Sequence, residues 1–122
     1  RCKALDRFGQ VAIREASEEI ALDVRSGEAL GFWALEQVYP YYLSQLDCIV
    51  MSPRFVVQVG GSWEPTLNAE HTDHRWIRAP EHEGRRAQEH FMWPGQKRAV
   101  TELLTEIAPE HAPAREHLRI TI

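Results

Sequence analysis

The sequence predicts an α+β domain in which a sheet packs between helices. Three observations carry this prediction: a helical pattern opens the chain, aromatic and β-branched runs fill its middle, and a second helical pattern lies near its end. Because helices and strands occur in blocks and not in a regular alternation, the α+β class is favoured over a parallel α/β sheet. The 122 residues are enough for one domain with one core.

The first helix is predicted at about residues 8–22, with Asp6 as its N-cap. Its apolar side consists of Val11, Ile13, Ala16 and Ile20. Residues 23–28 then read as a turn, because Gly27 interrupts the helical pattern there.

In the middle of the chain, the residue pattern predicts several short strands. Residues 32–39 are rich in aromatic and β-branched residues, which indicates a strand. Pro40 interrupts this run, so residues 41–43 form either a second short strand or a loop. A long apolar run at 47–59 follows, and Pro53 within it indicates a bulge or an edge position.

The last part of the chain predicts a second helix among loops and short strands. Apolar residues at helical spacing predict the helix, and Pro94 suits its start. In order, we expect a loop at 63–74, a short strand at 74–78, a helical turn or mobile surface loop at 81–89, the helix at about 95–107, and a short edge strand at 118–122.

Composition narrows the class of protein. The net charge of -4 argues against nonspecific nucleic-acid binding, which needs a basic surface, so no stable nucleic-acid partner is expected. No apolar stretch reaches the roughly 20 residues that span a bilayer, so no membrane partner is expected either. The two cysteines lack the spacing of a zinc site, which fits reduced thiols in the cytoplasm. Cys48 lies in an apolar run and is expected in the core.

Three carboxylates share one side of the first predicted helix. Glu15, Glu18 and Glu19 stand at i, i+3 and i+4, where like charges repel and weaken the helix. A hard divalent cation such as Mg²⁺, which takes oxygen ligands and leaves positions open for water and phosphate, would relieve this repulsion. The alternative is an ordinary solvated acidic face.

This helix resembles the signature of the Nudix hydrolase family, G-x5-E-x7-R-E-U-x-E-E-x-G-U, where U is a bulky apolar residue. The pair R-E matches at 14–15, E-E matches at 18–19, and Leu22 matches the last apolar position. Asp6 replaces the first acid, and Ala21 replaces the glycine near the end of the signature. The first glycine of the signature would fall before residue 1.

The second half of the chain adds to the resemblance. Residues 67–77 are similar to the E-H-x4-W segment of many Nudix proteins, and residues 93–100 to the start of their closing helix. This pairing resembles the dihydroneopterin triphosphate and dATP pyrophosphohydrolase branch. The resemblance implies a Nudix-type α/β/α sandwich with a mixed central sheet between helices, and residues 1–122 as a single domain. The strands that precede the signature in the family are missing here, so we expect the natural protein to be longer.

The resemblance also implies roles for named residues. Glu15, Glu18 and Glu19 are the expected ligands of Mg²⁺, with Mn²⁺ as an alternative ion. Glu18 or Glu19 is expected to accept the proton of the attacking water. Glu70 is a further candidate for ligand or general base, with a solvated loop acid as the alternative. Arg14 is expected to pair with an acid of the signature and orient it, since its guanidinium suits that role.

The implied activity is Mg²⁺-dependent hydrolysis of the pyrophosphate bond in a nucleoside diphosphate linked to another group, with a nucleoside triphosphate favoured. Its partner is thus a small nucleotide-type substrate, and the family also allows a homodimer. One alternative is a Nudix-fold module that binds nucleotide without catalysis, and another is an acidic helix in an unrelated interaction domain. His71 is expected to be a surface or capping group.

Overall fold

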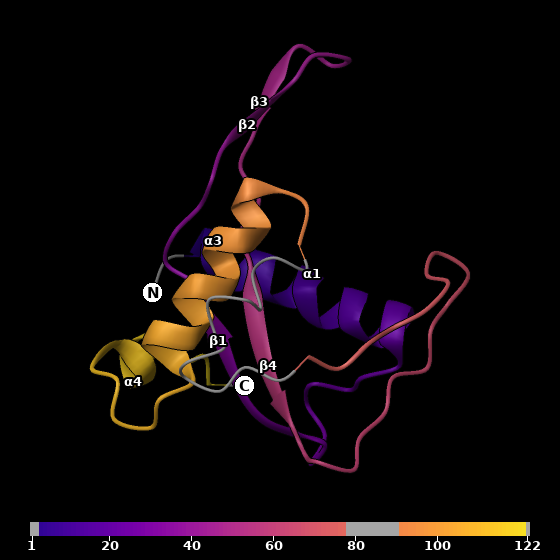
Figure 1. Cartoon of the computed structure of the whole chain (residues 1–122), viewed down its shortest axis with the longest axis vertical. Helices are drawn as coiled ribbons and strands as arrows, with labels where there is room; N and C mark the ends of the chain where they lie inside the picture. The colour runs from indigo at the N-terminus through magenta and orange to yellow at the C-terminus, as the bar shows by residue number, and fades with distance from the viewer. Residues whose placement is uncertain (1–2, 78–90, 122) are drawn as a thin grey trace. The chain divides into compact units, whose positions relative to one another are not determined.

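A computed structural model describes residues 3–77 and 91–121 (Figure 1). In chain order its elements are α1 (Lys3–Ile20), β1 (Ala29–Ala34), β2 (Tyr41–Leu43), β3 (Cys48–Val50), β4 (Phe55–Val59), α3 (Pro94–Glu102), the π-helical turn η2 (Leu103–Ile107) and α4 (Ala114–Leu118). This mixture of helices and short strands confirms the α+β class. Within the described part of the chain, both strand pairings are antiparallel.

The chain divides into two compact units. The first consists of Arg1–Ala34, Phe55–Trp76 and Arg119–Ile122, and the second of Leu35–Arg54 and Ile77–Leu118. Among the described residues, the first unit holds the antiparallel pair β1–β4 and the second the antiparallel pair β2–β3.

In the first unit, α1 packs against the β1–β4 pair. Ile13 of α1 and Phe32 of β1 are buried in one cluster with Leu22 and Val24 of the connecting segment. The Phe32 ring stacks on Phe55 of β4, with the ring centroids 5.5 Å apart. The helix that carries the acidic residues is therefore held to the sheet by its apolar side, as amphipathic spacing predicts.

Gly31 permits the indole of Trp33, two residues later in strand β1, to lie against the backbone at residue 31. A Cβ atom at residue 31 would stand 2.3 Å from Cη2 of Trp33, so a larger residue does not fit there. Trp33 is only 1% exposed, which places its large ring in the interior. The ladder between β1 and β4 shifts register between Ala29 and Gly31, beside this contact.

In the second unit, β2 and β3 form a hairpin. Residues 41–43 are thus a strand, one of the two alternatives the sequence left open. Asp47 has a φ of 48° in the turn, and its carboxylate accepts a 2.6 Å hydrogen bond from the Tyr42 hydroxyl. Cys48 is exposed, so its predicted core position is wrong. Among the described strands β3 pairs only with β2, and two of its three residues, Cys48 and Ile49, are exposed.

The closing helix begins at Pro94, as the sequence indicated, and its last turn is the π-helical η2. Buried Glu102 accepts hydrogen bonds from the backbone N–H groups of Glu36 (2.6 Å) and Gln37 (3.1 Å), which satisfies a carboxylate inside the unit. The sequence did not predict α4, which follows at Ala114–Leu118.

Four other expectations need correction. Helix α1 begins at Lys3, so Asp6 lies inside it and is not the N-cap; the intervening residues are good helix formers. Strand β1 ends at Ala34, short of the predicted residue 39, and no strand forms at 74–77. The edge strand after residue 118 is reduced to a single bridge between Trp33 and Arg119.

The prediction for residues 81–89 lies outside the described residues, as do residues 78 and 122. Among the helices that the structure describes, none is both long and apolar enough to cross a membrane.

Candidate metal centre

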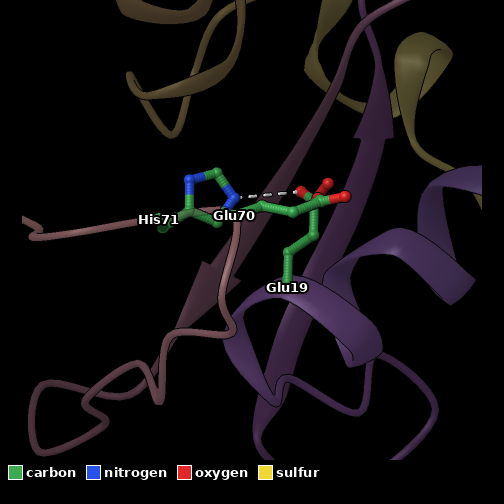
Figure 2. A group of neighbouring side chains, drawn as sticks. All are labelled: Glu19, Glu70 and His71. Atoms are coloured by element: carbon green, nitrogen blue, oxygen red, sulfur yellow. Dashed lines mark ion pairs between the residues drawn. The ribbon is translucent and has the colours of Figure 1, made fainter.

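Side chains from α1 and from the loop after β4 converge in the first unit. The candidate ligand atoms of Glu19, Glu70 and His71 all lie within 4.8 Å of one another (Figure 2). The Nε2 atom of His71 stands 3.5 Å from Oε2 of Glu19. Glu19 is half-buried, whereas Glu70 and His71 are exposed, so the group is open to solvent. Two carboxylates and an imidazole form a donor set that suits a divalent ion.

Backbone hydrogen bonds hold the loop against the end of α1. The N–H of Thr66 donates to the carbonyl of Ile20 at 3.0 Å, and the N–H of Asn68 donates to the carbonyl of Glu19 at 3.1 Å. The last carbonyls of a helix lack partners within the helix, so the loop satisfies groups that would otherwise need water. This attachment brings Glu70 to Glu19, which lies about 50 residues earlier in the chain.

Asn68 joins all three members of the cluster. Besides its contact with Glu19, its side-chain Oδ1 accepts a 3.0 Å hydrogen bond from the N–H of Glu70. Its carbonyl accepts a 3.2 Å bond from the N–H of His71. Asn68 is therefore the positioning residue of the loop. The sequence carried a signal for it that was missed, because an asparagine in a loop favours such an Asx turn with the backbone N–H two residues on.

The cluster is negative for two physical reasons. It contains two carboxylates, and Glu19 lies in the last turn of α1, where the helix dipole places partial negative charge. An acid at that end is unfavourable unless a cation balances it. The location therefore favours a cation and disfavours an anion.

The structure does not bring Glu15 and Glu18 into this group. Glu15 stands one turn before Glu19, about 6 Å along the helix axis, and Glu18 stands about 100° around the axis from Glu19. Both are exposed. Arg14 Nε lies 3.9 Å from Oε1 of Glu18, and both side chains are largely exposed, so this ion pair adds little to stability.

The residue that follows α1 has a left-handed backbone conformation. Ala21 follows the last helical residue with a φ of 57°, and the N–H of Leu22 turns back to the carbonyl of Ala16 at 3.1 Å. Glycine adopts this conformation without strain, whereas alanine does not. The glycine of the signature falls at this position, so the structure supplies the physical reason for the signature residue that this chain lacks.

A family model described as the NUDIX domain matches residues 5–103. The chain belongs to the Nudix family. The match includes the acidic helix, the loop with Glu70 and His71, and most of the closing helix. No curated protein and no solved structure matches the chain.

Membership of the Nudix family gives the cluster its chemical context, because the family's hydrolases generally use divalent metals such as Mg²⁺. Of the residues expected to hold the ion, Glu19 and Glu70 lie together. His71 is exposed, as expected of a surface group, and the structure adds that its ring lies beside Glu19. The signal for His71 was its position next to Glu70 in the E-H-x4-W segment.

Proposed function

We propose that this Nudix domain is a Mg²⁺-dependent pyrophosphohydrolase. Its substrate is a nucleoside diphosphate linked to another group, with a nucleoside triphosphate favoured. The observation that supports this proposal is the meeting of a Nudix-box acid, Glu19, with the loop acid Glu70 and with His71. No other group of three such residues occurs in the part of the chain that the structure describes.

The residues present suit a divalent ion. Glu19 and Glu70 offer carboxylate oxygens, which are the ligands that Mg²⁺ prefers. When bound, the ion neutralises phosphate charge and lowers the pKa of a water molecule. In this proposal Glu15 and Glu18, which are exposed on the same helix, serve as further carboxylate ligands of the metal.

The protein's own groups then perform two tasks. A carboxylate of the box, Glu18 or Glu19, or the loop acid Glu70, accepts the proton of the attacking water. The backbone contacts through Asn68 hold Glu70 beside Glu19, so the acids need little rearrangement when substrate binds. Arg14 restrains Glu18 through their contact on the helix surface.

The decisive test is Glu19→Gln, which keeps the shape of the side chain and removes its charge. We expect turnover to fall by about two to three orders of magnitude, the range that loss of one electrostatic group in an active site produces. Glu64→Gln is the matched control, because Glu64 also faces a histidine but lies outside the cluster. Phosphate or pyrophosphate release with Mg²⁺ is measured, and circular dichroism checks the fold.

The same assay decides the substrate class and the alternative of a binding module. Nucleoside triphosphates, dinucleotide polyphosphates, nucleotide sugars and dihydroneopterin triphosphate are compared at equal concentration. Turnover of nucleoside triphosphates above the others supports the proposal. Thermal stabilisation by nucleotide and Mg²⁺ without any release of product would instead identify a binding module, and wild-type rates in Glu19→Gln would remove Glu19 from catalysis.

A further inference from the structure

His71 brings a nitrogen donor to a site that the Nudix box alone would build from oxygen. We propose that His71 is a ligand of the divalent ion and shifts the site's preference from Mg²⁺ toward first-row transition ions such as Mn²⁺. This inference rests on the proposed function, because it concerns the same metal centre. It goes beyond it by naming a ligand and an ion preference that the box carboxylates do not supply.

The geometry fits a shared ion. Two ligands at about 2.1 Å from one ion lie about 3 Å apart when they are at right angles. The 3.5 Å between Nε2 of His71 and Oε2 of Glu19 is close to that spacing. The ring, the Glu19 carboxylate and the Glu70 carboxylate converge in Figure 2 from two separate segments. Small side-chain movements thus suffice to bring all three donors to one ion.

The charges also fit. Two carboxylates and a neutral imidazole carry a charge of -2, which a divalent ion balances. Three protein donors leave about half of a six-coordinate shell for water and substrate phosphate. His71 is 42% exposed and Glu19 is 37% exposed at the side chain, so solvent and substrate can reach the ion.

The nitrogen donor determines whether the site prefers Mg²⁺ or Mn²⁺. Mg²⁺ is a hard ion that takes oxygen ligands almost exclusively, whereas imidazole suits transition ions. A site of carboxylates alone discriminates weakly between Mg²⁺ and Mn²⁺. Adding an imidazole strengthens Mn²⁺ binding more than Mg²⁺ binding, so the ratio of the two dissociation constants reports on the ligand.

A second pair in the same loop offers a matched control. His74 Nε2 lies 3.3 Å from Oε2 of Glu64, and the ring is as exposed as that of His71. His74 does not belong to a group of three candidate ligands among the described residues. If any loop histidine beside a glutamate bound Mn²⁺, both would do so, and the two substitutions would have equal effects.

The experiment uses the whole chain without a histidine tag and compares wild type, His71→Gln and His74→Gln. Mn²⁺ binding is followed by electron paramagnetic resonance, and electron spin-echo modulation detects nitrogen coordinated to the ion. We expect nitrogen coupling in wild type and His74→Gln and none in His71→Gln. The ratio of the Mg²⁺ to the Mn²⁺ dissociation constant should fall by at least about tenfold in His71→Gln, since even an outer-shell partner is worth that much.

The results separate this inference from the proposed function. Absence of nitrogen coupling in wild type, coupling that persists in His71→Gln, or an unchanged ratio would each overturn the role of His71. If Glu19→Gln still loses turnover with Mg²⁺, the proposed pyrophosphohydrolase function is supported even though His71 is not a ligand. Conversely, nitrogen coupling that depends on His71 supports the ligand even where no substrate is hydrolysed. Thermal unfolding of each variant verifies that the fold is intact.

Discussion

Two histidines of one loop each face a glutamate at nearly the same distance, yet their surroundings differ. His71 Nε2 lies 3.5 Å from Glu19, and His74 Nε2 lies 3.3 Å from Glu64. The first pair connects the loop to α1, whereas both members of the second belong to the loop itself. A third residue, the acid Glu70, belongs only to the first group.

Aromatic side chains surround the second pair, His74 and Glu64. The indole N–H of Trp76 donates a 3.2 Å hydrogen bond to Oε2 of Glu64, the same oxygen that faces His74. The rings of Trp63 and His74 each meet the Trp76 ring edge to face. An oxygen that already receives an N–H bond is less available to an ion.

The comparison shows that a histidine–glutamate contact does not by itself define a metal ligand. Alone and exposed, such a pair is worth little. With a second carboxylate beside it, such a pair becomes a set of metal donors. With an indole N–H bonded to its carboxylate, it becomes a structural contact. The substitutions that follow change the residues that hold Glu70 near Glu19, the end of helix α1, and a comparable carboxylate contact elsewhere in the chain.

Among the three substitutions that follow, the largest effect is expected from Asn68→Ala, which removes the side-chain oxygen that holds the N–H of Glu70. Mn²⁺ affinity should fall about tenfold, or about 1.4 kcal/mol, because Glu70 loses its fixed place beside Glu19. Asp73→Ala is the control, since Asp73 Oδ1 also accepts a backbone hydrogen bond, from the N–H of the adjacent His74 at 2.8 Å. Isothermal titration measures both, and equal affinities would show that the two pairs do not differ.

A smaller effect is expected from Ala21→Gly at the end of α1. Glycine relieves the left-handed strain but gains freedom in the unfolded chain, so the free energy of unfolding should rise by about 0.5 to 1 kcal/mol. Ser17→Gly, on the exposed helical part of α1, should lower it by about 0.5 kcal/mol. Urea denaturation measures both changes. A loss of stability in Ala21→Gly would contradict the strain argument.

The smallest effect concerns the contact between the Asp47 carboxylate and the Tyr42 hydroxyl in the β2–β3 hairpin. The hydrogen bond to Asp47, with a lesser contribution from desolvation, raises the pKa of Tyr42 above 10.0. Because the folded-state pKa is raised, the stabilising contribution is present below pH 10 and is lost as pH rises through the folded pKa. Asp47→Asn should move this pKa back toward 10.0 without changing Mn²⁺ affinity.

Ultraviolet titration of the phenolates measures this shift, and Tyr42→Phe identifies the component that belongs to Tyr42 among the three tyrosines. An alkaline titration of Asp47→Asn that superimposes on wild type would mean that the contact has no influence on the phenol.

Much of the local structure was predictable because it depends on neighbouring residues. The spacing of Ile13, Glu15 and Glu19 predicted a helix with an apolar and an acidic side, and Pro94 marked the start of the last helix. The environment of Cys48 was not predictable from its apolar neighbours, because exposure depends on whether another layer covers the strand. The conformation of Ala21 was likewise hidden, since alanine gives no signal for a positive φ.

By itself, the sequence determined the α+β class, the acidic helix and the resemblance to the Nudix family, all of which depend on residue types at fixed spacing. Only the tertiary structure decided which acids meet. Glu19 joins Glu70 and His71, while Glu15 and Glu18 stay apart from them. The physical reason is that backbone groups of the loop satisfy the last carbonyls of α1, and this attachment between distant segments determines where each side chain lies.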